Sequence, residues 1–149
     1  MSFGVEIPFV TLLGIELTAF GEGKSEIVFP VQPEHLNSFE VTHGGALMTL
    51  LDVTMATAAR SVSPDLGVVT IEMKTSFMRP AVAAHGALTA RGELMHRTAT
   101  LAFTQATAFD ATGKPCAHAT GTFKYVKRLA TGPRSVNGAR IPVGTLSTD

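Results

Sequence analysis

Hydrophobic and polar positions change their period along the chain, and the changes predict the secondary structure. Residues 15–20 and 25–31 are β-prone, and the Gly-containing segment 21–24 between them predicts a hairpin. Before them, an apolar stretch over 8–13 that ends at a glycine fits a single helical turn. The polar, irregular residues 33–42 follow the hairpin and predict a loop.

Residues 45–60 predict one long helix. They contain no proline, and their apolar side chains occupy most of the helical circumference. Such a helix has to be covered by protein on most sides, so it is expected at the centre of the fold. Thr42 is expected as its N-cap, and residues 61–67, with Pro64, end it. The apolar positions are Ala46, Leu47, Leu50, Leu51, Met55, Ala58 and Ala59.

The rest of the chain reads as extended structure. Four long strands are expected, over 68–78, 83–95, 99–110 and 117–127, with breaks at 79–80, 96–97 and 110–114. Apolar and polar residues alternate within 101–109, as in a sheet with one packed face. The order of two strands, one helix and four strands predicts an α+β domain whose antiparallel sheet wraps around or lies on one long helix.

Composition fits one folded domain. The chain has 149 residues, of which 45% are hydrophobic and 16% charged, far from the composition of disordered chains. We assign residues 1–129 to the domain. Residues 130–149, rich in Gly, Pro and small polar residues, are expected to form a tail that is either mobile or docked on a partner subunit.

Charge excludes some functions and leaves others open. Twelve basic side chains balance twelve acidic ones, which argues against binding to nucleic acid or to an anionic membrane. However, residues 76–149 hold nine basic and three acidic side chains, which forms either a local anion site or a solvated basic edge. No stretch approaches the ~20 apolar residues of a membrane span. The single cysteine, Cys116, cannot form an intrachain disulfide, and a cytoplasmic location is expected. The histidines show no ligand spacing, so no metal is expected.

Unusual polar residues cluster at the start of the long helix. Gly44 and Gly45 offer backbone N–H donors that a substrate oxygen can approach, which is the outline of an oxyanion hole. Asp52 lies two turns further on among apolar residues, so it should have a raised pKa or a specific polar partner. Each residue also has a simpler interpretation. Asp52 can face a solvent channel or bond a backbone amide, His43 can bond the backbone at the helix start, and Asn37 can be a turn residue.

Together these residues resemble a known signature. Asn37, then His43-Gly44-Gly45 six residues later, then Asp52 nine after His43, resembles hotdog-fold acyl-CoA thioesterases of the PaaI-like, phenylacetate-degradation type. The order of elements is similar too, and residues 69–80 resemble the third strand of that family and its exit. The resemblance covers residues 8–128.

The resemblance implies a homodimer with one continuous sheet and active sites at the subunit boundary; such dimers often pair into homotetramers. It implies that the Gly44 N–H and the Asn37 amide polarise the thioester carbonyl, with His43 beside the same sulfur or oxygen. Asp52 of the other subunit would activate water or attack the carbonyl itself. Thr70 takes the place of a family Ser or Thr that helps to hold the water. No cofactor is implied.

The bound coenzyme A needs cations for its phosphates. The candidates are Arg79, His96, Arg97 and Lys124, each of which can equally be a solvated edge charge. The acyl group is expected to be aryl or medium-chain. The residues that line its pocket, or that pack the core instead, are Phe9, Leu12, Leu13, Met48, Leu51 and Met55.

Two other functions stay open. The hotdog fold also serves acyl-CoA hydratases and dehydratases, which carry an Asp and a His five residues apart in one loop. No Asp in this sequence has a His five positions later. A noncatalytic acyl-CoA-binding protein would need the pocket without Asp52, so the presence of Asp52 and Asn37 disfavours that function.

Overall fold

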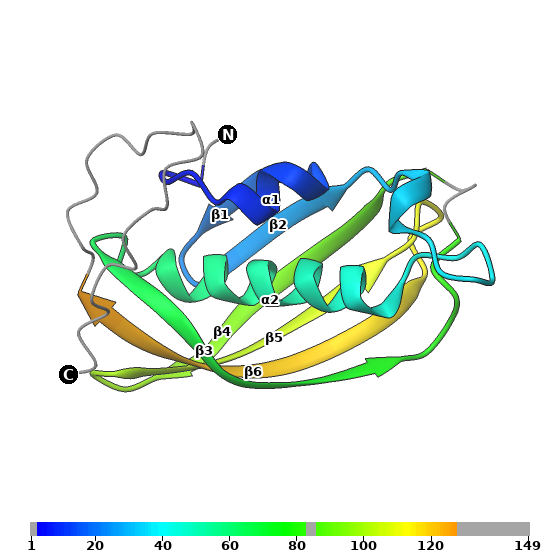
Figure 1. Cartoon of the computed structure of the whole chain (residues 1–149). Coiled ribbons are helices and arrows are strands. Elements are labelled where there is room, and N and C mark those ends of the chain that lie inside the picture. Colours follow the sequence, from blue (N-terminus) through cyan, green and yellow to red (C-terminus); the bar gives the residue numbers. More distant parts are fainter. Residues whose placement is uncertain (1–2, 83–85, 128–149) are drawn as a thin grey trace.

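The long helix lies at the centre of the molecule. In the computed structural model, which describes residues 3–82 and 86–127, α2 (Gly44–Arg60) runs along one face of a six-stranded antiparallel sheet (Figure 1). This is the α+β hotdog architecture that the sequence predicts. The other elements are α1 (Pro8–Leu13), β1 (Glu16–Gly21), β2 (Lys24–Phe29), the 3-10 turn η1 (Pro33–His35), β3 (Leu66–Phe77), β4 (Leu88–Arg97), β5 (Leu101–Phe109) and β6 (Pro115–Lys127).

The strand order is β1-β2-β4-β5-β6-β3. The strand that follows α2 therefore lies at an edge of the sheet, beside β6, and not next to β4, which follows it in sequence. No described residue pairs with the outer edge of β3, which is 12 residues long. A long edge strand exposes a row of backbone donors and acceptors that a further strand can pair with.

Glycine allows the helix to approach the sheet closely. A Cβ at Gly92 in β4 would lie 2.7 Å from the Ser25 hydroxyl oxygen and 2.8 Å from the Thr54 carbonyl oxygen. In its absence, the Ser25 hydroxyl donates to the Thr54 carbonyl at 2.6 Å and joins β2 to α2. Gly121 in β6 likewise makes room for the Met55 side chain. Fully buried residues from the helix and the sheet form the core between them, among them Ile27, Phe29, Leu50, Leu51, Met55, Leu88 and Phe123.

Several predicted boundaries move. The second strand ends at Phe29, two residues early, because Pro30 has no N–H to continue the ladder. The fourth begins at Leu88 and not at 83, and it continues through the predicted break at 96–97 because a bulge keeps it paired with β5. The turn lies at Thr98 instead, whose hydroxyl oxygen accepts from the backbone N–H groups of Thr100 and Leu101.

The helix cap also differs from the prediction. The prediction of Thr42 as N-cap is wrong: the helix begins at Gly44, and the His43 imidazole accepts from the Gly45 N–H. Thr42 lies one residue earlier, where its hydroxyl and its backbone N–H both donate to the Ala81 carbonyl. The proposed domain boundary at 129 and the tail over 130–149 lie outside the described residues. In the part of the chain that the structure describes, no helix is long and apolar enough to cross a membrane.

Candidate active site

The start of α2 is held by His43. Its imidazole Nδ1 accepts a hydrogen bond from the Gly45 N–H at 2.8 Å. A neutral imidazole has one acceptor and one donor nitrogen, so this bond places the proton of the neutral ring on Nε2. The His43 N–H donates to the His35 carbonyl at 2.8 Å and fixes the backbone there. The predicted bond between His43 and the backbone is therefore confirmed, and it leaves the Nε2–H donor for a further partner.

Gly44 supplies the remaining donor of the first helical turn. The Ala46 and Leu47 N–H groups both donate to the His43 carbonyl, and the Gly45 N–H donates to the imidazole. Within residues 3–82 and 86–127, the Gly44 N–H has no acceptor. A Cβ at position 44 would touch the Phe77 ring at 3.4 Å, so glycine keeps the space between the helix start and β3 open. An unpaired N–H at a helix N-terminus is the donor that an oxyanion needs.

Asn37 shapes the loop that precedes this donor. Its side-chain oxygen accepts from the Phe39 N–H at 2.9 Å and from the Val41 N–H at 3.3 Å, so it is a turn residue as the simpler interpretation holds. Because both bonds use Oδ1, the Nδ2 hydrogens stay available to donate. The turn role and a carbonyl-polarising role are therefore compatible in one side chain.

Asp52 is half-buried on α2. The Thr70 hydroxyl on β3 donates to its Oδ1 at 2.7 Å. Burial raises the pKa of the Asp52 carboxyl, and the Thr70 bond opposes this increase only in part. No described cation forms an ion pair with Asp52. The sequence prediction of a raised pKa or a polar partner for Asp52 is confirmed on both counts, whereas the water-holding role that the resemblance implies for Thr70 stays a prediction.

A single chain keeps the two halves of this constellation apart. Gly44 and Asp52 are eight residues apart on one helix, and a rise of 1.5 Å per residue separates them by about 12 Å along its axis. His43 and Gly45 lie with Gly44, whereas Thr70 lies with Asp52. The structure therefore places an unpaired backbone N–H and a carboxylate at two different points along α2.

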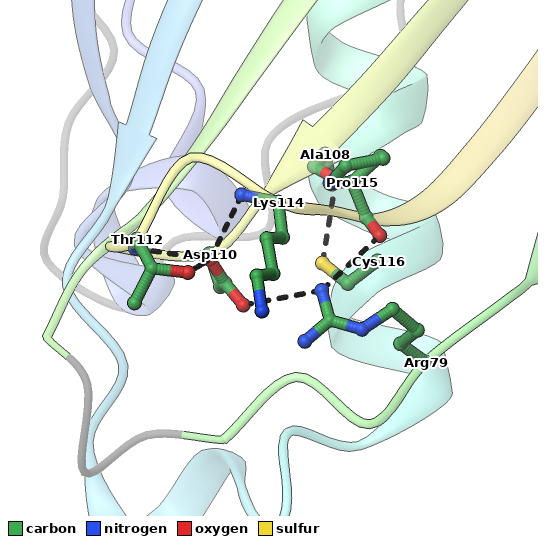
Figure 2. Close-up of polar contacts among 7 residues, drawn as sticks. All are labelled: Arg79, Ala108, Asp110, Thr112, Lys114, Pro115 and Cys116. Atoms are coloured by element: carbon green, nitrogen blue, oxygen red, sulfur yellow. Dashed lines mark hydrogen bonds and ion pairs between the residues drawn. The ribbon is translucent and has the colours of Figure 1, made fainter.

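Arg79 holds a turn (Figure 2). Its Nη1 donates to the Asp110 carboxylate at 3.3 Å and lies 3.5 Å from the Pro115 carbonyl oxygen. The Asp110 carboxylate also accepts from the Thr112 hydroxyl at 2.6 Å and from the backbone N–H of Lys114 at 3.1 Å. The Thr112 bond, more than the backbone bonds and the Arg79 charge, lowers the pKa of Asp110 to about 2. Sequence reasoning missed this cluster, although an Asp that starts a Thr-Gly turn is a typical signal for it.

The other three predicted cations lie far from Arg79. The Arg97 guanidinium lies 4.2 Å from the centre of the Tyr125 ring and donates to the Ser63 hydroxyl. His96 stacks on Phe103 with ring centres 6.1 Å apart. Lys124 is half-buried on β6, near the end of that strand opposite to the turn that Arg79 binds. In one chain, the four candidates therefore form two groups at opposite ends of the sheet.

The apolar candidates also divide. Leu51 and Met55 are fully buried and pack the core, whereas Met48 is 38% exposed. Phe9 and Leu12 are exposed and Leu13 is half-buried on α1. Sequence reasoning missed a group of exposed apolar residues that flank Asn37 and Gly44, because exposure depends on which elements cover them. These residues are Phe39, Phe77 and Met78.

Known proteins resemble this chain in sequence and in fold. The family described as the thioesterase superfamily matches residues 39–117. A conserved protein of Pseudomonas aeruginosa of known structure is 30% identical, with a TM-score of 0.76, over 81% of this chain and 95% of that one. The PaaI protein of the E. coli phenylacetic acid degradation operon is 26% identical, with a TM-score of 0.73, over 79% and 83% of the two chains.

Curated sequences point the same way. A Saccharolobus solfataricus protein whose name marks it as a candidate esterase is 28% identical over 116 residues, which cover 78% of this chain and 81% of that protein. The family match spans more than half of the 149 residues and includes His43, Gly44, Asp52 and Thr70. The chain therefore belongs to the thioesterase superfamily, as a PaaI-like hotdog protein of the class that hydrolyses esters and thioesters.

Proposed function

We propose that the protein hydrolyses acyl-CoA thioesters to the free acid and coenzyme A. The observation that carries this proposal is the half-buried Asp52 carboxylate, which is held by Thr70 and has no cationic partner among the described residues. A carboxylate with a raised pKa is a stronger base than one in water, and a general base is what hydrolysis of an activated thioester requires.

The proposed site needs two copies of the chain. A base has to lie within hydrogen-bonding reach of its target or within one water of it, which is at most about 6 Å. The Gly44 N–H and the Asp52 of one chain are about twice that distance apart along α2. The exposed edge of β3 offers the means to bring Asp52 from a second copy, because pairing β3 with β3 continues the sheet and places the two central helices side by side.

In the proposed reaction the Asp52 carboxylate of one copy takes a proton from water, and the water oxygen attacks the thioester carbon. The Gly44 N–H and the Asn37 amide of the other copy stabilise the oxyanion that forms. The intermediate then expels the coenzyme A sulfur, to which the Nε2–H of His43 is proposed to donate, because the Nδ1 of that ring accepts from Gly45. The carbon–sulfur bond breaks, and the thiolate leaves with a proton that Asp52 can return.

Coenzyme A phosphates are proposed to meet cations from both copies. Antiparallel pairing of β3 brings the end of one chain that carries Arg97 and Lys124 toward the end of the other chain that carries Arg79. Two groups that are separate within one chain thereby become neighbours. Because Arg79 and Arg97 already have partners, any contact with phosphate would use their remaining N–H donors.

The proposed acyl group is aryl or medium-chain. The apolar residues that flank the oxyanion donor are large and partly exposed, with Phe77 at 51% and Met48 at 38%. Aromatic and methionine side chains offer broad, adaptable apolar surfaces. Such surroundings favour an apolar acyl chain over a charged one.

The test is the steady-state release of coenzyme A, followed with a thiol reagent, from aryl-, hydroxyaryl- and straight-chain acyl-CoAs. The wild type should turn over at least one class, and Asp52→Asn should lose about 10²–10⁴-fold in kcat. Ser76→Ala, an exposed residue on the face of β3 that points away from α2, is the matched control and should retain activity. Binding of acyl-CoA without turnover would instead favour a binding protein or a hydratase.

A further inference from the structure

The hydroxyl of Thr75 on β3 is buried and has no hydrogen-bond partner among the described residues. Thr75 is opposite Ala119, which is fully buried in the core, so its side chain lies on the face of the sheet that α2 covers. A buried, unpaired hydroxyl is unfavourable, and native structures generally supply a partner for it. A partner for Thr75 is therefore expected from outside the described residues, and the exposed edge of β3 is where a second copy would supply it.

The residues of β3 that share this face follow an irregular spacing. A bulge at Ile71 adds one residue between Thr70 and Glu72, so the face continues from Thr70 to Met73 and not to residue 72. The cross-strand partners of these positions on β6 are all buried, including Tyr125 opposite Val68, which is only 5% exposed. Along the strand the face reads Val68, Thr70, Met73, Thr75 and Phe77.

The opposite face of β3 carries one charge on each side of Met73. Glu72 and Lys74 are exposed, and neither forms an ion pair with another described residue. The Glu72 Oε1 accepts from the Thr122 hydroxyl, which leaves Oε2 for a second partner. Two β3 strands paired antiparallel about Met73 set Glu72 of each copy opposite Lys74 of the other. A shift of the register in either direction sets Glu72 against Glu72 or Lys74 against Lys74, which is repulsive.

The same register connects the unpaired hydroxyl of Thr75 with the separation of Gly44 and Asp52 within one chain. With the bulge at Ile71 in both copies, Thr75 of one strand lies opposite Thr70 of the other, and Phe77 lies opposite Val68. Thr70 holds Asp52, and the Phe77 ring lies beside Gly44, 3.4 Å from where a Cβ at position 44 would be. A register chosen from charge alone thus brings the oxyanion donor of one copy to the carboxylate of the other.

We propose that two copies pair through β3 about Met73 and that Thr75 of one copy is a positioning residue, whose hydroxyl donates to the Asp52 carboxylate of the other. Cross-strand neighbours have Cβ atoms about 4.5–5.5 Å apart, within reach of this contact. Thr70 then holds one carboxylate oxygen and Thr75 the second. This inference rests on the proposed two-copy thioesterase site.

Disulfide cross-linking tests the register without any need for activity. Three single-cysteine substitutions on β3 are oxidised under mild conditions and compared for the rate of cross-linking between copies: Met73→Cys, Glu72→Cys and Lys74→Cys. The wild type, with its buried Cys116, is the control. Met73→Cys is expected to cross-link fastest, because in this register only position 73 faces its own copy. Faster cross-linking at 72 or 74 would overturn the register.

A charge exchange tests it independently. Glu72→Lys and Lys74→Glu should each weaken the dimer, measured as the dissociation constant by sedimentation. The variant that carries both changes restores two opposite-charge pairs and should regain most of the wild-type affinity. If the double variant associates no more tightly than the single variants, the Glu72–Lys74 pairing is wrong.

The role of Thr75 is read from kinetics and from coupling. Thr75→Val should lower kcat about tenfold with little change in KM, and Thr75→Ser should restore it, whereas Thr120→Val on the exposed face of β6 should have no effect. A wild-type kcat for Thr75→Val in an active enzyme would overturn the role.

If the wild type hydrolyses no acyl-CoA, the proposed function fails. In that case the contact between Thr75 and Asp52 is still tested by a double-mutant cycle of Thr75→Val and Asp52→Asn, with the dimer dissociation constant as the readout. The effects of the two substitutions on this constant should differ from additivity by about fivefold, and additive effects would contradict the contact.

Discussion

The carboxyl of Asp52 has to lose its own proton before it can accept one from water. Burial raises its pKa above the ordinary 3.8, and the bond from Thr70 lowers it. Activity should therefore rise with pH on the acidic side of its pH profile, with a midpoint above pH 3.8. Thr70→Val removes the bond that stabilises the charged form, so its limb should move to higher pH. The measurement is kcat/KM against pH for both proteins, and a limb that moves to lower pH in the variant would contradict this role of Thr70.

Asp110 should make the stability of the folded protein depend on pH below the ordinary carboxyl pKa of 3.8. Its pKa is lowered from 3.8 to about 2, so its hydrogen bonds stabilise the folded state fully above 3.8 and are lost as the pH falls toward 2. Asp110→Asn should be less stable at neutral pH but should lose less stability between these values. Thermal unfolding at a series of pH values measures this, and parallel curves for the two proteins would rule it out.

Packing of α2 on the sheet depends on the absence of a side chain at Gly92. Gly92→Ala would place a Cβ 2.7 Å from the Ser25 hydroxyl oxygen and 2.8 Å from the Thr54 backbone oxygen, which cannot move without shifting the helix. We expect a loss of about 1–3 kcal/mol in the free energy of unfolding, measured with urea. Gly67→Ala, whose Cβ would meet the end of the Val126 side chain at 3.2 Å, should cost less. Equal effects of the two substitutions would show that the helix can adjust.

A site shared between two copies predicts complementation. Asp52→Asn and Asn37→Ala should each be inactive alone, since each removes one half of every site. Refolded as a mixture, the two variants form mixed dimers in which one site carries both changes and the other carries neither, so up to about a quarter of all sites are intact. Activity measured before and after mixing is the test. A mixture as inactive as its components would place both groups in a single chain.

Local pattern determined much of this protein. The apolar circumference of residues 45–60 is enough to predict a central helix, and the spacing along the sequence places Gly44 next to its predicted start and Asp52 two turns later. These features depend on neighbours within a few residues, so a single sequence contains them. For the same reason the burial of Asp52 could be predicted from the leucines and methionines around it. The alternation over residues 101–109 likewise predicted β5.

Other features exist only once distant segments meet. His43, and not Thr42, is the helix cap, and Thr42 instead donates to the carbonyl of Ala81, which lies far along the chain. The order of the strands puts β3 at an edge, and its bulge leaves Thr75 unpaired on the covered face. Pairing between segments far apart in sequence is set by packing and by backbone hydrogen bonds, which composition and periodicity do not encode. The sequence by itself therefore determined which groups can do the chemistry and their spacing of about 12 Å along one helix. The tertiary structure decided that β3, which carries Thr70 and Thr75, lies at an edge of the sheet where a second strand can pair, because strand order depends on contacts between distant segments.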